Sequence, residues 1–245
     1  PNLFQPDTVA FHRIVESLPA NTPVLVAVDY EPGLSGEMQL AAAPVINQLN
    51  ARGARLALIS TNPSGPVLAE NLLRAAGTSP SLMFTNLGFL PGGTAGLQEF
   101  ASRPRVAMQY GLDGGQAWNT DALLGVDGIT NFGAVIVLTE NAETARSWIE
   151  QVQPALGSVP LLMVVSAQAA PMVQPYLDSG QVQGMVSGMS GGTMYAQISG
   201  QSGAWLDYWD SYQLGIFAAI AFILLGGAVQ IFSSLFRRPA SRKKA

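Results

Sequence analysis

The sequence predicts an α/β protein in which a largely parallel β-sheet carries helices on both faces, followed by one C-terminal transmembrane helix. Two observations support this fold class. Short and almost wholly apolar segments alternate with helical patterns along most of the chain, which is typical of parallel strands that are buried on both faces. Near the C-terminus, residues 214–236 form an apolar run without any charged residue.

Five segments are predicted as strands because they are short, apolar and rich in β-branched residues. They are residues 24–29, 55–60, 134–139, 161–166 and 182–187. Four of them are each followed by a helical segment, so we expect these four to lie in one largely parallel sheet. Their central residues are Val26, Leu58, Val137 and Val164.

Helices are predicted between the strands. Residues 36–50 have apolar residues at helical spacing, and residues 65–76 are followed by Gly77, where a helix-ending glycine belongs. Asn141 is placed to cap a third helix, whose apolar residues share one face. The glycine-rich segment 78–133 is harder to assign. The predicted layering is that of a Rossmann-like domain.

The run 214–236 is long enough to cross a membrane. At 1.5 Å per residue it makes a helix of about 34 Å, against about 30 Å for the hydrocarbon core of a bilayer. Aromatic residues before it and arginines after it are expected at the membrane surfaces: Trp205, Tyr208, Trp209, Tyr212, Arg237 and Arg238. We therefore expect a body (1–203), an interface segment (204–213), a transmembrane helix (214–236) and a basic tail (237–245).

The distribution of charge predicts the orientation of the chain in the membrane. Five of the 12 Lys and Arg residues lie in the last nine positions, which leaves seven basic residues against 16 acidic ones before them. The positive-inside rule places the basic tail in the cytoplasm and the body outside it, in a single-pass protein of the cell membrane. Export of the body needs a signal, so we expect either that an export signal has been removed ahead of Pro1 or that a transmembrane helix precedes it. The acidic body excludes nucleic acid as a partner, since nucleic-acid binding requires neutralisation of phosphates.

Small and polar residues in the predicted transmembrane helix indicate a membrane-protein partner. Gly215, Ala219, Gly226 and Gly227 keep parts of the helix thin, and Gln230 brings an amide into the span. Small residues allow close helix approach, and amides hydrogen-bond across helices in lipid. The alternative for Gln230 is that its side chain extends toward the cytoplasmic membrane surface.

Asp29 ends the first predicted strand and Glu31 lies two residues on, whereas Ser60 ends the second and is followed by Thr61 and Asn62. Residues 24–63 thereby resemble the start of haloacid dehalogenase-type phosphatases, which implies Asp29 as nucleophile, Glu31 as general acid and Thr61 as a phosphate contact. The sequence departs from that family in having Glu31 instead of a second Asp, no lysine in the body, and no acidic pair after strand 134–139. We expect these residues to end strands and shape loops, or to line a binding crevice that includes Asn62.

Two glycine-rich segments offer weaker candidates. Residues 188–192 match G-x-S-x-G, with Ser190 at the nucleophile position, but a serine needs a base and the only histidine is His12, far upstream. A turn that lets two chain segments approach closely is the preferred interpretation. Gly92 and Gly93 open a predicted helix, where backbone amides could bind an anion. One histidine and no cysteine predict no metal site, and nothing in the sequence predicts a cofactor.

The pattern resembles that of bacterial single-span membrane-anchored α/β proteins. We therefore expect an extracytoplasmic accessory or scaffolding subunit of a membrane protein complex, without catalysis. Two alternatives remain open. One is a hydrolase, or a degenerate relative of one, that uses Asp29 and Glu31 or Ser190. The other is a sensor of a small ligand at the carboxyl edge of the sheet.

Overall fold

The computed structural model describes residues 5–79, 82–201 and 204–236, and the chain divides into two compact units, Pro1–Trp205 and Leu206–Ala245. The predicted basic tail, including Arg237 and Arg238, lies outside the described residues. The backbones of Trp205, Tyr208, Trp209 and Tyr212 are helical, but their side chains lie outside the described part. The membrane-interface role of all six residues therefore stays a prediction.

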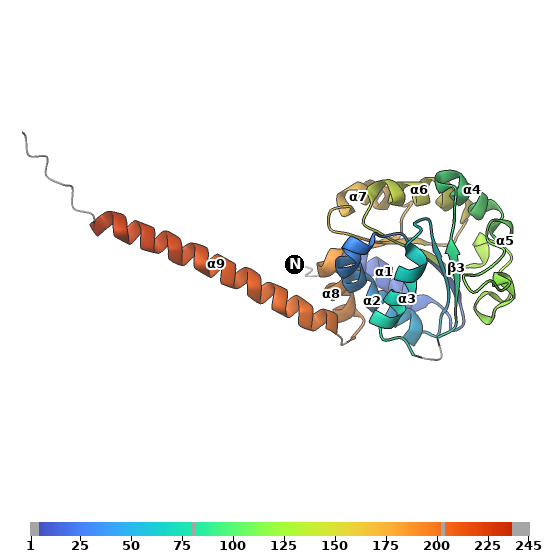
Figure 1. Ribbon diagram of the computed structural model, residues 1–245, viewed down its shortest axis with the longest axis horizontal. Helices are drawn as coiled ribbons and strands as arrows, with labels where there is room; N and C mark the ends of the chain where they lie inside the picture. The colour runs from blue at the N-terminus through green and yellow to red at the C-terminus, as the bar shows by residue number, and fades with distance from the viewer. Residues whose placement is uncertain (1–4, 80–81, 202–203, 237–245) are drawn as a thin grey trace, which may run out of the picture. The chain divides into compact units, whose positions relative to one another are not determined.

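One six-stranded, fully parallel sheet forms the centre of the first unit, within the described residues (Figure 1). Its spatial order is β3-β2-β1-β4-β5-β6. The strands are β1 (Pro23–Val28), β2 (Arg55–Ser60), β3 (Phe84–Phe89), β4 (Ala134–Thr139), β5 (Leu161–Val165) and β6 (Gly184–Ser187). Val26, Leu58, Val137 and Val164 lie on four adjacent parallel strands. The predicted fold class is therefore confirmed, with the strand order typical of Rossmann-like domains.

Helices cover both faces of the sheet, with α4, α6 and α7 on one face and α1, α2, α3 and α8 on the other (Figure 1). The helices of the body are α1 (Pro6–Ser17), α2 (Ser35–Ala51), α3 (Gly65–Ala75), α4 (Gly93–Ser102), α5 (Pro104–Ala107), α6 (Ala142–Val152), α7 (Ala170–Asp178) and α8 (Gly188–Ile198). Short 3-10 helices are η1 (Pro32–Leu34), η2 (Ala117–Asn119), η3 (Asp121–Leu123), η4 (Ile129–Asn131) and η5 (Gln153–Ala155).

Two predicted helix ends are confirmed by their hydrogen bonds. The Asn141 side chain accepts hydrogen bonds from the backbone N–H groups of Glu143 (2.8 Å) and Thr144 (3.1 Å) at the start of α6. Gly77 adopts φ +63° just after α3, and its N–H donates to Arg74 O. A left-handed residue at this position is what favours glycine there.

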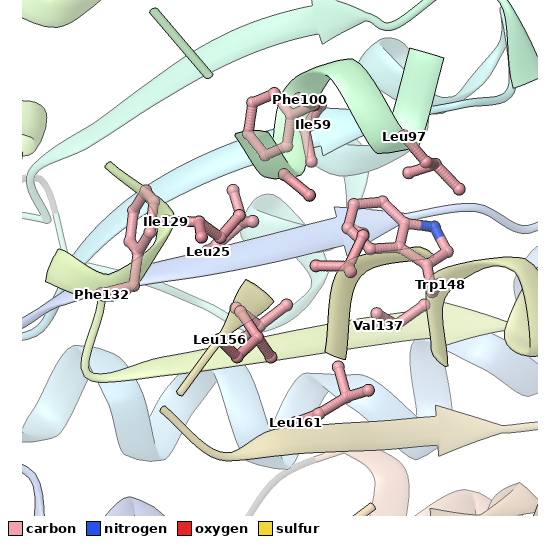
Figure 2. Close-up of a cluster of buried hydrophobic side chains, with 14 of the residues drawn as sticks. Leu25, Ile59, Leu97, Phe100, Ile129, Phe132, Val137, Trp148, Leu156 and Leu161 are labelled. Atoms are coloured by element: carbon pink, nitrogen blue, oxygen red, sulfur yellow. The ribbon is translucent and has the colours of Figure 1, made fainter. Parts of the chain in front are cut away.

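The core between the sheet and the α4/α6 layer is built around Trp148. This side chain is fully buried, together with Phe100 from α4 and Leu25 from β1. Figure 2 shows side chains from both helices lying over those of the strands. The spacing that placed Ala145, Trp148, Ile149 and Val152 on one face of a helix thus corresponds to a buried face.

Strand β3 is the one strand of the described sheet that the sequence pattern did not reveal. Its sequence, FTNLGF, interrupts an apolar pattern with Asn86 and Gly88, and its pairing with β2 has an irregular register between Leu58 and Ile59. The strand lies at the edge of the sheet, so a neighbouring strand covers only one of its sides. An edge strand needs fewer apolar residues than a central one, which explains the weak signal.

The second unit contains most of α9 (Ala204–Phe236). Within this helix, Gln213–Gln230 has a mean hydropathy of 1.9, and none of its residues is buried. The helix is therefore long and apolar enough to span a membrane. It begins ahead of the predicted span, so the expected interface segment is helical as well.

Candidate functional site

A polar crevice lies at the carboxyl edge of the sheet, where the strand order reverses between β1 and β4. Connections on the two sides of this point leave the sheet in opposite directions, which opens a crevice where α/β proteins commonly bind ligands. Here the cavity has a volume of about 240 Å³. It is lined by Asp29, Glu31, Thr61, Asn62, Pro63, Glu140, Asn141 and Thr144.

Asp29 is almost wholly buried, with 4% of its surface exposed, and its carboxylate accepts four hydrogen bonds. Oδ1 accepts from Ser60 Oγ (2.7 Å) and from the backbone N–H of Thr61 (2.6 Å). Oδ2 accepts from Thr61 Oγ1 (2.9 Å) and from Trp148 Nε1 (2.6 Å). A carboxylate has about four lone-pair sites, so this hydrogen-bonding capacity is filled.

This arrangement suits a structural tie better than a nucleophile. The Asp29 backbone N–H also donates to Leu138 O of β4, which continues the β1–β4 ladder beyond the end of β1. The residue thus connects β1 with the end of β2, with β4 and with Trp148 on α6. A nucleophile needs a lone pair directed at its substrate, whereas each oxygen of Asp29 already accepts two donors.

Glu31 and Asn62 meet at the mouth of the crevice, as the sequence suggested. Asn62 Nδ2 donates to Glu31 Oε1 at 3.0 Å, and Asn62 Oδ1 accepts from the backbone N–H of Ser64 at 3.0 Å. The carboxyl ends of adjacent parallel strands lie at the same edge of a sheet, which explains the meeting. Glu31 is therefore already engaged as a hydrogen-bond acceptor on the rim.

Glu140, directly after β4, is the residue of the crevice that sequence reasoning missed. Its Oε1 accepts from the backbone N–H of Glu31 (3.2 Å), whereas its Oε2 is buried and has no hydrogen-bond partner among the described residues. Burial raises the pKa of the Glu140 carboxyl, backbone N–H groups lower it in part, and the charges of Glu31 and Asp29 raise it further. The sequence has no acidic pair after this strand but does place this single acid directly behind it.

A second cavity of about 240 Å³ adjoins the first and shares Thr61, Asn141 and Thr144 with it. Gly93 and Thr94, at the start of α4, line this cavity, whereas neither lining includes Gly92. Gly92 has φ +93° and directly precedes the helix. Of the glycine candidates, Gly93 alone therefore borders the crevice region.

The crevice offers carboxylates, amides and hydroxyls, and no cationic side chain lines it. Such a surface suits ammonium or guanidinium groups and hydroxyl donors, and it repels phosphate groups. Across the described part of the chain, no group of three or more His, Asp or Glu residues is placed to hold a metal ion. The site therefore favours binding of a small cationic or polyol ligand over phosphoryl transfer.

Ser190 lies apart from these residues, exposed in the first turn of α8 directly after β6. The predicted strand-to-helix context is present, but His12 lies on α1, within hydrogen-bond distance of Gln48 and edge-on to the Tyr195 ring. Gly192 lies so close to α2 that an added Cβ would stand 2.6 Å from Ala41 Cα. The glycines of this motif thus allow α8 and α2 to pack closely.

No protein-family model matches the chain, and no curated protein matches it either.

Proposed function

We propose that this protein is a membrane-anchored accessory or scaffolding subunit whose body acts outside the cytoplasm without catalysis. The observation that carries the proposal is the wholly exposed apolar stretch Gln213–Gln230. An apolar surface of this length is unfavourable in water and stable in a bilayer or against other membrane helices. The saturated carboxylate of Asp29 supports the non-catalytic part of the proposal.

Protease accessibility tests the topology. Proteinase K added to intact spheroplasts should digest the body and spare a C-terminal epitope tag on the basic tail. Spheroplasts opened with detergent serve as the control, because both parts are then accessible. Protection of the body with loss of the tag in intact spheroplasts would reverse the proposed orientation.

Co-purification in mild detergent tests the accessory role, with helix variants that separate packing from anchoring. An added Cβ at Gly226 or Gly227 meets no atom within 4 Å, so these positions leave room for a neighbouring helix. Replacing both by Leu should weaken association more than Gln230→Leu, because an interhelical polar contact contributes only about 0.6–2 kcal/mol. Leu224→Ile is the volume-matched control. Unchanged stoichiometry in both variants would remove the main support for this proposal.

A small-ligand sensor is the second candidate, and Glu140 is the observation that favours it. Its buried Oε2 lacks a partner among the described residues and belongs to a residue that lines the crevice. Calorimetric titration with guanidinium and methylammonium should detect binding that Glu140→Gln weakens. Equal heats from the two proteins, or none at all, would argue against a sensor.

Turnover assays address the hydrolase alternative directly. The purified chain should hydrolyse neither p-nitrophenyl phosphate nor p-nitrophenyl acetate above the buffer rate. Turnover that Asp29→Asn or Ser190→Ala abolishes would contradict the non-catalytic proposal. Fluorophosphonate labelling provides a separate test of Ser190, whose labelling would show an activated hydroxyl.

A further inference from the structure

Strand β3 has one side that no other strand of the described sheet covers. The backbone N–H of Leu56 on β2 donates to Met83 O, and Leu56 is in register with Phe84. In a parallel ladder, the peptide groups of successive residues alternate between the two sides of the strand. The N–H and C=O of Phe84 and Asn86 therefore point away from β2, toward the free edge.

A neighbouring segment already uses one of these two positions. The backbone N–H of Leu112 donates to Asn86 O at 2.8 Å, and the segment is held in a tight loop by the Gly111 N–H, which donates to Gly115 O. One acceptor of the edge thus already binds a backbone N–H from a turn of the same chain. At Phe84, two residues earlier on the same edge, no backbone hydrogen bond to N–H or C=O is found among the described residues.

Two hollows border this open position, with volumes of about 460 and 450 Å³, and both are lined by Glu70 of α3 and by Phe84. They are called the groove below. Its rim exposes apolar side chains, with 45% of Phe84 and 52% of Leu112 accessible to solvent. An extended chain placed beside Phe84 would cover these side chains and pair with the free peptide group at the same time.

The charge of the groove indicates which charge the side chains of a bound segment carry. The ionisable side chains that line the larger hollow are Glu70 and Asp113, both acidic. Arg74 lines the other hollow, and its hydrogen bond to the neutral Asn71 Oδ1 leaves its positive charge in place there. A basic side chain in the added segment would therefore find opposite charge in the larger hollow, beside Glu70 and Asp113.

We propose that the free edge of β3 binds an extended peptide segment of a partner protein, added as a strand beside Phe84. One apolar side chain of that segment covers Phe84 and Leu112, and a basic side chain faces Glu70. The inference rests on the proposed accessory function, since it describes how the body would hold its partner outside the membrane.

Fluorescence anisotropy of the full chain in detergent tests the proposal. The probe is a labelled peptide of sequence Thr-Val-Arg-Val-Arg-Val-Thr, and its acidic counterpart has Glu in place of each Arg. The basic peptide should bind at least about tenfold more tightly than the acidic one. Glu70→Gln should reduce this preference, and Met172→Ala, at an exposed apolar position on α7, should leave it unchanged.

Phe84→Pro tests the backbone pairing, because proline removes an N–H that β2 does not use and is tolerated on edge strands. It should weaken binding of the basic peptide by about tenfold or more. Phe84→Ala retains the N–H and should weaken binding less, and thermal melting shows whether either variant alters the fold. Unchanged binding to folded Phe84→Pro, or equal binding of the two peptides, would overturn the proposal.

Analytical ultracentrifugation tests whether a second copy of this chain, instead of a partner peptide, occupies the edge of β3. A concentration-dependent dimer that Phe84→Pro abolishes, without peptide binding, would assign the edge to a second copy of the chain and overturn the proposal. Loss of peptide binding with intact co-purification would leave the accessory function standing. Peptide binding by a chain that co-purifies with no membrane partner would support the peptide site on β3 and contradict the accessory function.

Discussion

At the scale of single residues, Asp29 connects parts of the chain that are far apart in sequence. Trp148, which donates to its Oδ2, lies 119 positions away. Trp148→Phe keeps most of the buried ring and removes this donor, so it should lower the free energy of unfolding by about 1.5–3 kcal/mol, the range for a hydrogen bond to a charged group. Chemical denaturation followed by circular dichroism measures the change. Glu150→Gln, at an exposed position on the same helix, is the control, and an equal effect there would contradict the role of Asp29.

Glu140 should make stability depend on pH. Because its pKa is raised in the folded state, the stabilising contribution of its protonated form is complete below the ordinary pKa of a glutamate. It is lost as pH rises through the raised value. Glu140→Gln should therefore flatten the stability profile as pH rises above the ordinary glutamate pKa of about 4.3, as measured by chemical denaturation in a pH series that starts below that value. An unchanged profile would show that other groups govern it.

The sequence predicted the residues of the crevice only where strands that are consecutive in sequence are also neighbours in the sheet. Asp29, Glu31, Thr61 and Asn62 could be placed together because they follow strands that lie side by side in a simple α/β pattern. Glu140 could not, because its role depends on β4 lying next to β1. That neighbourhood results from the reversal of strand order, which no local pattern encodes.

At the scale of elements, the contact between α8 and α2 depends on the absence of a side chain. Gly192→Ala would place a Cβ 2.6 Å from both Ala41 Cα and Leu40 O, so the backbone must shift. We expect a loss of about 1–3 kcal/mol, as for other overpacked sites. Gly36→Ala is the matched control: an added Cβ there meets no atom within 4 Å, and the helix should gain stability. Thermal melting compares the two, and equal effects would contradict close packing.

Elements with continuous apolar patterns were predictable, whereas those with mixed patterns were not. Strand β4 is buried along its whole length, and α6 repeats its apolar residues at helical spacing on one face. Segment 78–133 combines β3 with short helices whose order depends on tertiary contacts, such as the Trp118 Nε1 bond to Met108 O at 2.5 Å. Local secondary-structure propensity does not predict the structure of such a segment.

At the scale of the whole molecule, the two compact units should differ in their preferred solvent. The first unit buries most of its large apolar side chains in two layers around the sheet, whereas Gln213–Gln230 buries none. A chain ending at Gln201 should stay in the aqueous phase of a Triton X-114 partition, and the full chain should enter the detergent phase. The reverse distribution, or equal partition of both chains, would show that α9 does not act as an anchor.

The packing of α1 against β6 also determines when the body can complete its folding. Gly184 of β6 lies so close to α1 that an added Cβ would stand 2.7 Å from Phe11 Cα, and Thr8 Oγ1 donates to Met185 O, 177 positions later. Helix α1 therefore lacks much of its packing surface until β6 has been made. Contacts of such long sequence separation form late and slow folding. During synthesis, completion of the domain and emergence of the apolar helix that follows it should thus be nearly simultaneous events.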